Sequence, residues 1–328
     1  MSTPRFQRRQ FMGMALAAGA MPMMGHAQTT WPTKPVTNVV PFPAGGGTDA
    51  FARPLSTAFS RITGHNMILD YRGGAGGTVG AAIAAKAAPD GYTYFMGAVH
   101  HAIAPSMYPK LDYDLERDFV PLTLVATVPF VLVANPQKIT APDFKTFLNQ
   151  VKNSPGRLNF ASAGNGTAHQ MAGELFKLQT KTFITHIPYR GAGPALQDLM
   201  AGNVELMFDG LGSSAQHIKS GRIKALMVAG AQRNPAIPDV PCAAELGLKD
   251  YNVSTWYGLW APKGVPAATQ TAFLEVIKKA RELPEIKTAW ANSGAEFPSM
   301  TPAQFGEFVS AETKRWAAVV KASGAKLD

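Results

Sequence analysis

The chain has 328 residues, of which 46% are hydrophobic and 16% are charged. This balance is typical of a folded protein with room for two domains, and it excludes an intrinsically disordered chain. The formal net charge is +9 at pH 7, yet no long run of basic residues and no interleaved aromatic stripe accompanies it, so we expect no nucleic-acid partner.

The first predicted element is an export signal. Arginines precede an apolar run over residues 12–24, and the triplet Gly25-His26-Ala27 follows it. The run is shorter than the roughly 20 apolar residues that a membrane anchor needs, so we predict a signal peptide over residues 1–27, cleaved near Ala27. A pair of arginines also resembles a twin-arginine signal, and the choice between the two export routes stays open.

Beyond the signal, short β-rich runs alternate with helical segments, which predicts an α/β protein. Several runs are continuous and β-branched, as parallel strands covered on both faces are. The predicted strands are Val36–Phe42, Met67–Tyr71, Thr93–Ala98, Leu122–Val128, Val131–Ala134, Leu158–Ala161, Phe183–Pro188, Val204–Phe208, Ile223–Ala229 and Ser254–Ala261.

Several helices have clear boundary signals. One is predicted to open at Thr167, with Gln170 three residues later in the pattern of a capping box. A second is predicted over 192–201 and stops before a glycine. The last opens at Thr301, with Pro302 in its first turn.

One arrangement occurs twice: a strand, a loop of small residues and a capped helix. The first copy contains PFPAGGGTD at residues 41–49, and the second is NFASAGNGTAH at residues 159–169. Glycines let successive backbone N–H groups turn toward one point, and a helix adds about half a positive charge at its N-terminus. We expect Thr48 or Asp49 to cap the first helix. Each loop is therefore predicted to present an anion site, one per domain, to a shared cleft.

Motifs for nucleotide chemistry and catalysis are missing. Gly47 is followed by Thr48 instead of the lysine of a phosphate-binding loop, and the glycines from Gly74 to Gly80 depart from the dinucleotide fingerprint. There is no G-x-S-x-G elbow and no HExxH pattern, and the single cysteine excludes a cysteine-based zinc site. We expect no cofactor, no metal and no catalytic residue.

Some polar residues at strand ends allow more than one role. Asp209 could orient a histidine, meet a ligand or cap the helix that follows it. His100 and Arg190 also follow strands, at the edge where open α/β sheets bind ligands. Trp256 and Trp260 are predicted to be packing residues.

Longer stretches resemble a known family. They include VVPFPAGGGTD, RGGAGGTVGA, APDGYT, NFASAGNGTAHQMAGELF, HIPYRGAGPALQDLMAGNVELMFDG and STWYGLWAPKGVPA. Together they cover nearly the whole chain after the signal. They resemble the periplasmic solute receptors of tripartite tricarboxylate transporters, often called Bug proteins.

The resemblance implies an α/β fold of two domains, with the periplasmic-binding-protein (type II, Venus-flytrap) architecture. Each domain would hold a mainly parallel sheet, and two crossing strands would connect them. We expect domain 1 over residues 28–128 and 250–328 and domain 2 over residues 129–249. The implied function is capture of a small carboxylate, such as a di- or tricarboxylate or an aromatic acid, by a periplasmic monomer that passes it to integral membrane transporter subunits.

The family's binding loops also carry over to this sequence. In such receptors, the loops matching PFPAGGGTD and SAGNGT hold a ligand carboxylate through backbone N–H groups, hydroxyls and water. The ligand-binding residues expected from this match are Phe42, Ala44, Gly45, Gly46, Gly47, Asp49, Ser162, Asn165, Gly166, Thr167 and Asp209. We add His100, which stands where relatives often have Ser or Thr and is expected to change the distal pocket.

Two further points qualify the resemblance. Pro54 falls where relatives usually have a helix-forming residue, so the first helix is expected to lose a backbone hydrogen bond there. The competing interpretation is an exported α/β hydrolase-like enzyme acting on a small carboxylic acid or ester, and the third is a surface adhesion or scaffold protein.

Overall fold

The structure is a computed structural model that describes residues 31–325. The chain divides into the units Met1–Trp31 and Pro32–Asp328, and all contacts discussed below lie within the second unit. The predicted signal peptide over residues 1–27 lies outside the described residues.

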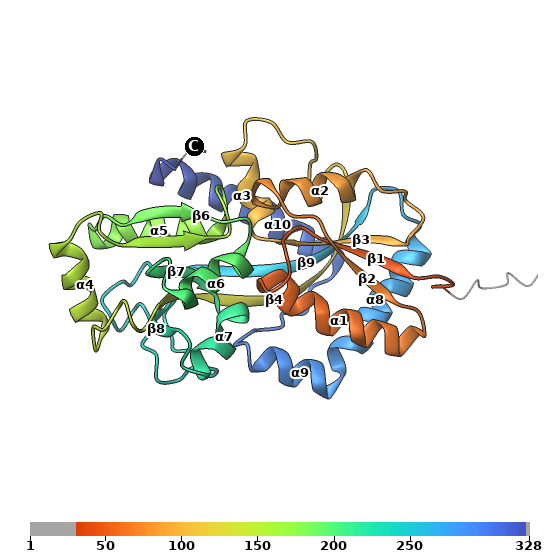
Figure 1. Ribbon diagram of the computed structural model, residues 1–328. Helices are drawn as coiled ribbons and strands as arrows, with labels where there is room; N and C mark the ends of the chain where they lie inside the picture. Colours follow the sequence, from red (N-terminus) through yellow and green to blue (C-terminus); the bar gives the residue numbers. More distant parts are fainter. Residues whose placement is uncertain (1–30, 326–328) are drawn as a thin grey trace, which may run out of the picture. The chain divides into compact units, whose positions relative to one another are not determined.

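Within residues 31–325, nine strands form one mixed sheet in the order β2-β1-β3-β9-β4-β7-β5-β6, and β8 also pairs with β4 (Figure 1). The strands are β1 (Val36–Val40), β2 (Met67–Tyr71), β3 (Thr93–Ala98), β4 (Phe119–Ala134), β5 (Asn159–Ser162), β6 (Thr185–Pro188), β7 (Leu206–Gly210), β8 (Lys224–Val228) and β9 (Ser254–Pro262).

Helices connect most of these strands. They are α1 (Gly47–Thr63), the 3-10 helix η1 (Ala75–Gly77), α2 (Thr78–Ala85), α3 (His100–Met107), α4 (Phe144–Asn153), α5 (Ala168–Thr180), α6 (Ala192–Ala201), α7 (Leu211–Lys219), α8 (Ala267–Glu282), α9 (Pro284–Ala291) and α10 (Pro302–Ser323). None of those in the described part of the chain combines the length and apolar character needed to cross a membrane. Pro54 lies inside α1, which is one continuous helix.

The long strand β4 joins the two halves of the sheet. Its residues Phe119–Pro129 pair antiparallel with β9, Phe130–Ala134 pair antiparallel with β7, and Val131–Ala134 also pair antiparallel with β8. Beyond β9, β1 is parallel to β2 and β3, and β3 is antiparallel to β9. Beyond β7, β5 is parallel to both β6 and β7. Parallel strands therefore flank the antiparallel strands β4 and β9, which confirms the predicted fold class.

The prediction of two strands, Leu122–Val128 and Val131–Ala134, is wrong because the structure has one. Pro129 lacks a backbone N–H, but it lies where β4 leaves β9 and starts to pair with β7 and β8. The missing donor falls at a change of partner, so the strand continues through it.

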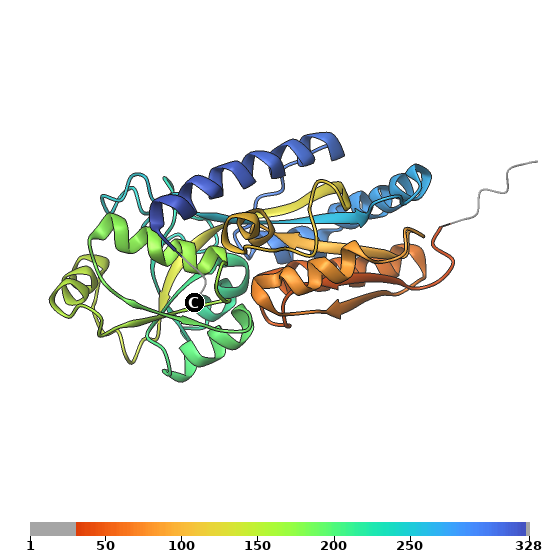
Figure 2. The same cartoon turned by 90° about the horizontal axis from the view of Figure 1, so that it is seen from above.

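The last helix contacts elements of both halves of the sheet. Helix α10 packs against α3 and β4 and also against α5, which follows β5 (Figure 2). Trp256 and Trp260 of β9 are each 1% exposed, and the Trp256 Nε1–H donates to Glu312 Oε2 of α10 at 2.9 Å. These tryptophans are packing residues, as predicted.

Candidate functional site

The first loop leads from β1 into α1. Gly46 is the N-cap residue and has no side-chain cap, so the expectation that Thr48 or Asp49 occupies that position is wrong. Asp49 is the third residue of the helix, and its Oδ2 accepts a hydrogen bond from the Gly45 N–H at 2.9 Å. Gly45 has a positive φ of 86°, which lets the loop curl back to that carboxylate.

Other donors also hold the carboxylate of Asp49. Arg53 Nη2 donates to Asp49 Oδ1 at 2.9 Å, and the Tyr71 hydroxyl donates to the same oxygen. Burial and the hydrogen bond to Asp49 raise the pKa of Tyr71 to about 12. The carboxylate of Asp49 therefore stabilises the conformation of the loop.

The N-terminus of α1 lies directly on β9. A Cβ atom at Gly47 would overlap the hydroxyl of Tyr257, so only glycine fits this close approach. The first N–H groups of a helix have no partner inside the helix. This N-terminus therefore offers the backbone donors of residues 47–49, whereas the Ala50 N–H already donates to the Gly46 carbonyl at 3.0 Å.

The second loop leads from β5 into α5, and Thr167 is the N-cap residue, as predicted. The predicted capping box is wrong, because Gln170 Oε1 accepts from the Gly166 N–H at 2.8 Å and the Thr167 hydroxyl donates to the Gly164 carbonyl at 2.6 Å. Gln170 is the third residue of α5, so it acts on the residue before the N-cap, as Asp49 does in α1. The two loops share one hydrogen-bonding device that the sequence pattern did not reveal.

Ser162 and Asn165 differ in whether their side-chain polar atoms have hydrogen-bond partners. Ser162 is fully buried, and its Oγ accepts from the Gly164 N–H at 3.0 Å and lies 2.6 Å from His186 Nε2. The Tyr108 hydroxyl donates to the Asn165 carbonyl at 3.0 Å, whereas the buried Asn165 Oδ1 has no hydrogen-bond partner within residues 31–325.

A cavity of about 360 Å³ brings the two loops together. Phe42 of the first loop and Ala163–Asn165 of the second line it, together with Gly74–Gly77 and Pro188–Arg190. The Arg190 side chain is exposed.

The N-terminus of α6 also lies against the first loop; the helix was predicted over 192–201, but its contact with this loop was not. A Cβ atom at Gly193 of α6 would overlap the Ala44 carbonyl oxygen, and one at Gly46 would lie 3.4 Å from the Ala192 Cβ. Backbone from the two halves of the sheet is therefore in close contact here. The only sequence signal was the run of small residues in Gly191-Ala192-Gly193.

His100, the first residue of α3, links both loops from inside. Its Nδ1 accepts a hydrogen bond from the Ala168 N–H of α5 at 3.0 Å, and its ring packs edge-on against Phe42 with 5.1 Å between the ring centroids. Burial holds the pKa of His100 well below its usual range, and the imidazoles of His169 and His101 lower that pKa further. A neutral imidazole thus accepts a hydrogen bond from one of the backbone N–H groups at the start of α5.

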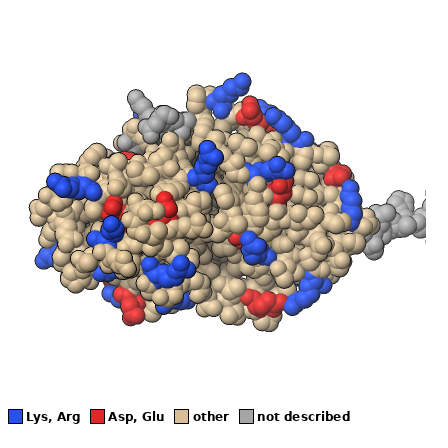
Figure 3. Space-filling model, viewed as in Figure 1, with Lys and Arg blue, Asp and Glu red and all other residues tan. Residues whose placement is uncertain are grey.

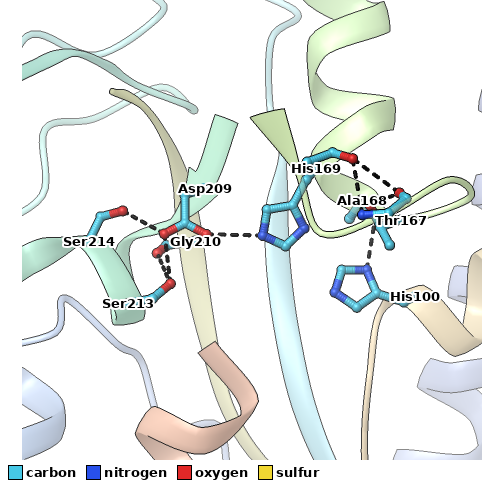
Figure 4. Close-up of polar contacts among 10 residues, drawn as sticks. His100, Thr167, Ala168, His169, Asp209, Gly210, Ser213 and Ser214 are labelled. Carbon is cyan, nitrogen blue, oxygen red and sulfur yellow. Dashed lines mark hydrogen bonds and ion pairs between the residues drawn. The ribbon is translucent and has the colours of Figure 1, made fainter. Parts of the chain in front are cut away.

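Asp209 is fully buried at the end of β7 and orients a histidine (Figure 4). His169 Nε2 lies 3.0 Å from Asp209 Oδ1, and the hydroxyls of Ser213 and Ser214 donate to Oδ2 at 2.7 and 2.5 Å. The alternative of a helix cap is wrong, because the N-cap of α7 is Gly210 and no side chain caps it.

This cluster differs from a hydrolytic triad. In a triad the imidazole stands between the serine and the carboxylate, so that it can take the serine proton. Here the carboxylate of Asp209 stands between His169 and the two serines, so this histidine does not activate either hydroxyl. Across the described residues, no group of three or more His, Cys, Asp or Glu side chains comes together to hold a metal.

Charge is dispersed on the face shown in Figure 3. Lysine and arginine side chains are scattered there among aspartates and glutamates, and much of the face is neutral. That face shows no continuous basic patch of the kind that nucleic-acid binding needs.

Comparison with known proteins places these features in a family. Residues 51–325 match the family described as tripartite tricarboxylate transporter family receptor. The chain is 37% identical to a protein encoded in the tcbD-tcbE intergenic region of Pseudomonas sp. (strain P51), over 94% of this chain and 92% of that protein. It is 36% identical to Protein BugT of Bordetella pertussis, over 91% of this chain and 92% of BugT.

Solved structures agree with this match. The periplasmic binding protein BugD has a TM-score of 0.86 at 32% identity, covering 91% of this chain and all 100% of BugD. MatC from Rhodopseudomonas palustris, solved with bound malate, has a TM-score of 0.82 at 34% identity, covering 88% of this chain and 99% of MatC. Rpa4515 of R. palustris, solved with adipate, has a TM-score of 0.86 at 31% identity, covering 91% of this chain and 100% of Rpa4515. With its α/β periplasmic-binding-protein fold and its two glycine-containing loops, this chain belongs to the receptor family of tripartite tricarboxylate transporters.

Proposed function

We propose that the protein binds a small carboxylate between the loop before α1 and the loop before α5. The observation that carries this proposal is the convergence of the two loops, because Phe42 and Ala163–Asn165 share one cavity and His100 contacts both sides. Neither loop contains a lysine or arginine. Backbone N–H groups at a helix N-terminus bind a carboxylate without a basic partner. Malate and adipate in two related structures support a ligand of this class.

The two loops contribute unequally in this proposal. In the second loop, the Gly166 and Ala168 N–H groups already donate to Gln170 and His100. At the start of α1, the N–H groups of residues 47–49 have no partner inside the helix. The proposal therefore assigns the carboxylate to the N-terminus of α1.

Capture also requires the two halves of the sheet to move. The change of partner in β4 at Pro129 and Phe130 is the proposed hinge, together with the start of β9. It coincides with the proposed division into residues 28–128 and 250–328 on one side and 129–249 on the other. The family match supports a receptor that passes its ligand to membrane transporter subunits. A monomer, exported to the periplasm and cleaved near Ala27, is part of the same proposal.

A thermal-shift screen of purified protein tests the function. Succinate, adipate, malate, citrate and benzoate are added singly, and a ligand at 100 times its dissociation constant should stabilise the fold by roughly 2.7 kcal/mol. Gly46→Val should abolish the shift, because the new side chain lies between α1 and Ala192. Ala267→Val, at the exposed first residue of α8, is the control and should keep it.

The outcomes separate the candidate functions. Normal binding by Gly46→Val would exclude a carboxylate site at α1. If no carboxylate stabilises the wild-type protein, the receptor proposal fails. Turnover of an ester by the purified protein would favour the hydrolase instead.

A further inference from the structure

Two buried imidazoles lie side by side at the N-terminus of α5, and they come from different halves of the sheet. His100 begins α3, after β3, and His169 is the second residue of α5, after β5. Their ring centroids are 5.3 Å apart with 31° between the ring planes, and the residues are 4% and 6% exposed (Figure 4). Within the described residues, each ring has one nitrogen that makes a hydrogen bond and one that has no partner.

The tautomer of His100 follows from its contact with α5. A backbone amide only donates, so the Nδ1 that accepts from the Ala168 N–H carries no proton. The neutral ring therefore carries its proton on Nε2. This Nε2–H makes no hydrogen bond to any residue between 31 and 325.

The tautomer of His169 follows from Asp209. The carboxylate only accepts, so the Nε2 that faces Asp209 Oδ1 at 3.0 Å carries a proton. In the neutral ring Nδ1 is then an acceptor. This atom is buried and has no hydrogen-bond partner in the described part of the chain. Folded proteins seldom leave a buried polar atom unpaired, because its desolvation is then uncompensated.

We infer that His100 and His169 together bind a hydroxyl group of the ligand, and that the preferred ligands are 2-hydroxycarboxylates. A hydroxyl oxygen accepts from His100 Nε2–H while its proton is donated to His169 Nδ1. A carboxylate cannot make the second bond and an ammonium cannot make the first, so a hydroxyl fits this pair of groups. The inference rests on the proposed carboxylate site and adds a second contact to it.

The position of the pair selects a hydroxyl close to the carboxylate. His100 bonds to Ala168, directly after the N-cap of α5, and packs against Phe42 at the start of the first loop. The proposed carboxylate position lies between these loops. The carbon next to the carboxylate is therefore the expected attachment point of the hydroxyl.

Matched pairs of acids test the inference by titration calorimetry. The probes are L-malate, D-malate and succinate, and L-lactate and propionate. We expect the better malate enantiomer to bind roughly tenfold tighter than succinate, and lactate tighter than propionate, since the hydroxyl makes two additional hydrogen bonds.

Two variants remove the nitrogens that have no partner and keep the hydrogen bonds to Ala168 and Asp209. In His100→Asn the side-chain oxygen can still accept from the Ala168 N–H, but the Nε2–H is gone. In His169→Gln the amide N–H can still donate to Asp209, but the Nδ1 acceptor is gone. Each variant should reduce the malate-to-succinate preference to about one. His65→Asn, two residues beyond the C-terminal end of α1, is the matched control and should keep the wild-type preference.

Each result has a definite meaning. Succinate binding with no preference for malate, or a preference that survives both variants, overturns the inference and leaves the carboxylate receptor intact. Binding of none of the five acids overturns the inference together with the proposed function for these ligands. A circular-dichroism melt of each variant establishes that a changed preference comes from folded protein.

Discussion

The imidazole of His101 is fully buried between β3 and η1. The Ala98 N–H donates to its Nδ1 at 3.1 Å, and its Nε2 lies 3.2 Å from the Gly77 carbonyl. Burial lowers the pKa of His101 to about 4, against the raising effect of its contacts with the backbone of Ala98 and Gly77. A neighbouring site residue, His100, has its pKa shifted in the same direction.

These shifts predict that the protein loses stability in mild acid. The unfolded chain binds a proton as the pH falls past about 6.5, whereas folded His101 does so only near pH 4. Its contribution is therefore fully present above pH 6.5 and is lost between pH 6.5 and 4, by roughly 3 kcal/mol. Urea unfolding at pH 7.5 and 4.5 measures the loss, which should be smaller in His101→Asn because asparagine does not titrate. Equal losses in both proteins would show that His101 is not responsible.

At the scale of elements, local signals predicted more than long-range contacts did. Strands β2 and β3 were predicted with the bounds the structure has, and Thr301 caps α10 with Gln304 completing a capping box. Strand β4 was predicted as two strands because its change of partner at Pro129 depends on strands that lie far away in the sequence. The hydrogen bond from the Gly166 N–H to Gln170 could not be predicted either, because Gln170 also has the spacing from Thr167 that a capping box requires.

The hydrogen bond from the Gly166 N–H to Gln170, at the N-terminus of α5, should contribute to ligand binding as well as to stability. Gln170 is 5% exposed, and Gln170→Ala leaves the buried Gly166 N–H without its acceptor, which should cost about 1 kcal/mol of unfolding free energy. The loosened loop should also reduce the thermal shift with succinate or malate. Gln304→Ala is the matched control, because Gln304 Oε1 accepts from the Thr301 N–H at an exposed site in α10. It should leave the ligand-induced shift unchanged, and an equal loss in both variants would contradict a role for Gln170 in the site.

At the scale of the whole molecule, the candidate site depends on residues that lie far apart in the chain. The glycine loops were found in the sequence because each follows a strand and precedes a helix. The hydrogen bond between His100 and Ala168, and the contact of Gly193 with Ala44, join segments that no local pattern relates. No sequence motif singled out His169, because its contacts are with Asp209 and His100, which lie far away in the chain. Local patterns therefore could not predict which distant residues the fold brings together.

The close approach of α6 to the first loop predicts a variant that cannot close. Gly193→Ala should leave α6 intact, since alanine is the better helix former, but its Cβ would overlap the Ala44 carbonyl oxygen. If ligand capture requires this approach, the variant should bind succinate or malate roughly tenfold more weakly, because the competent closed form becomes less populated. Small-angle scattering should show that the ligand compacts the wild-type protein but not the variant. Gly306→Ala in α10, where the new Cβ would meet only Pro121 Cγ at 3.3 Å, is the control and should bind normally. Wild-type affinity and compaction in Gly193→Ala would mean that the ligand is held without closure of the two halves.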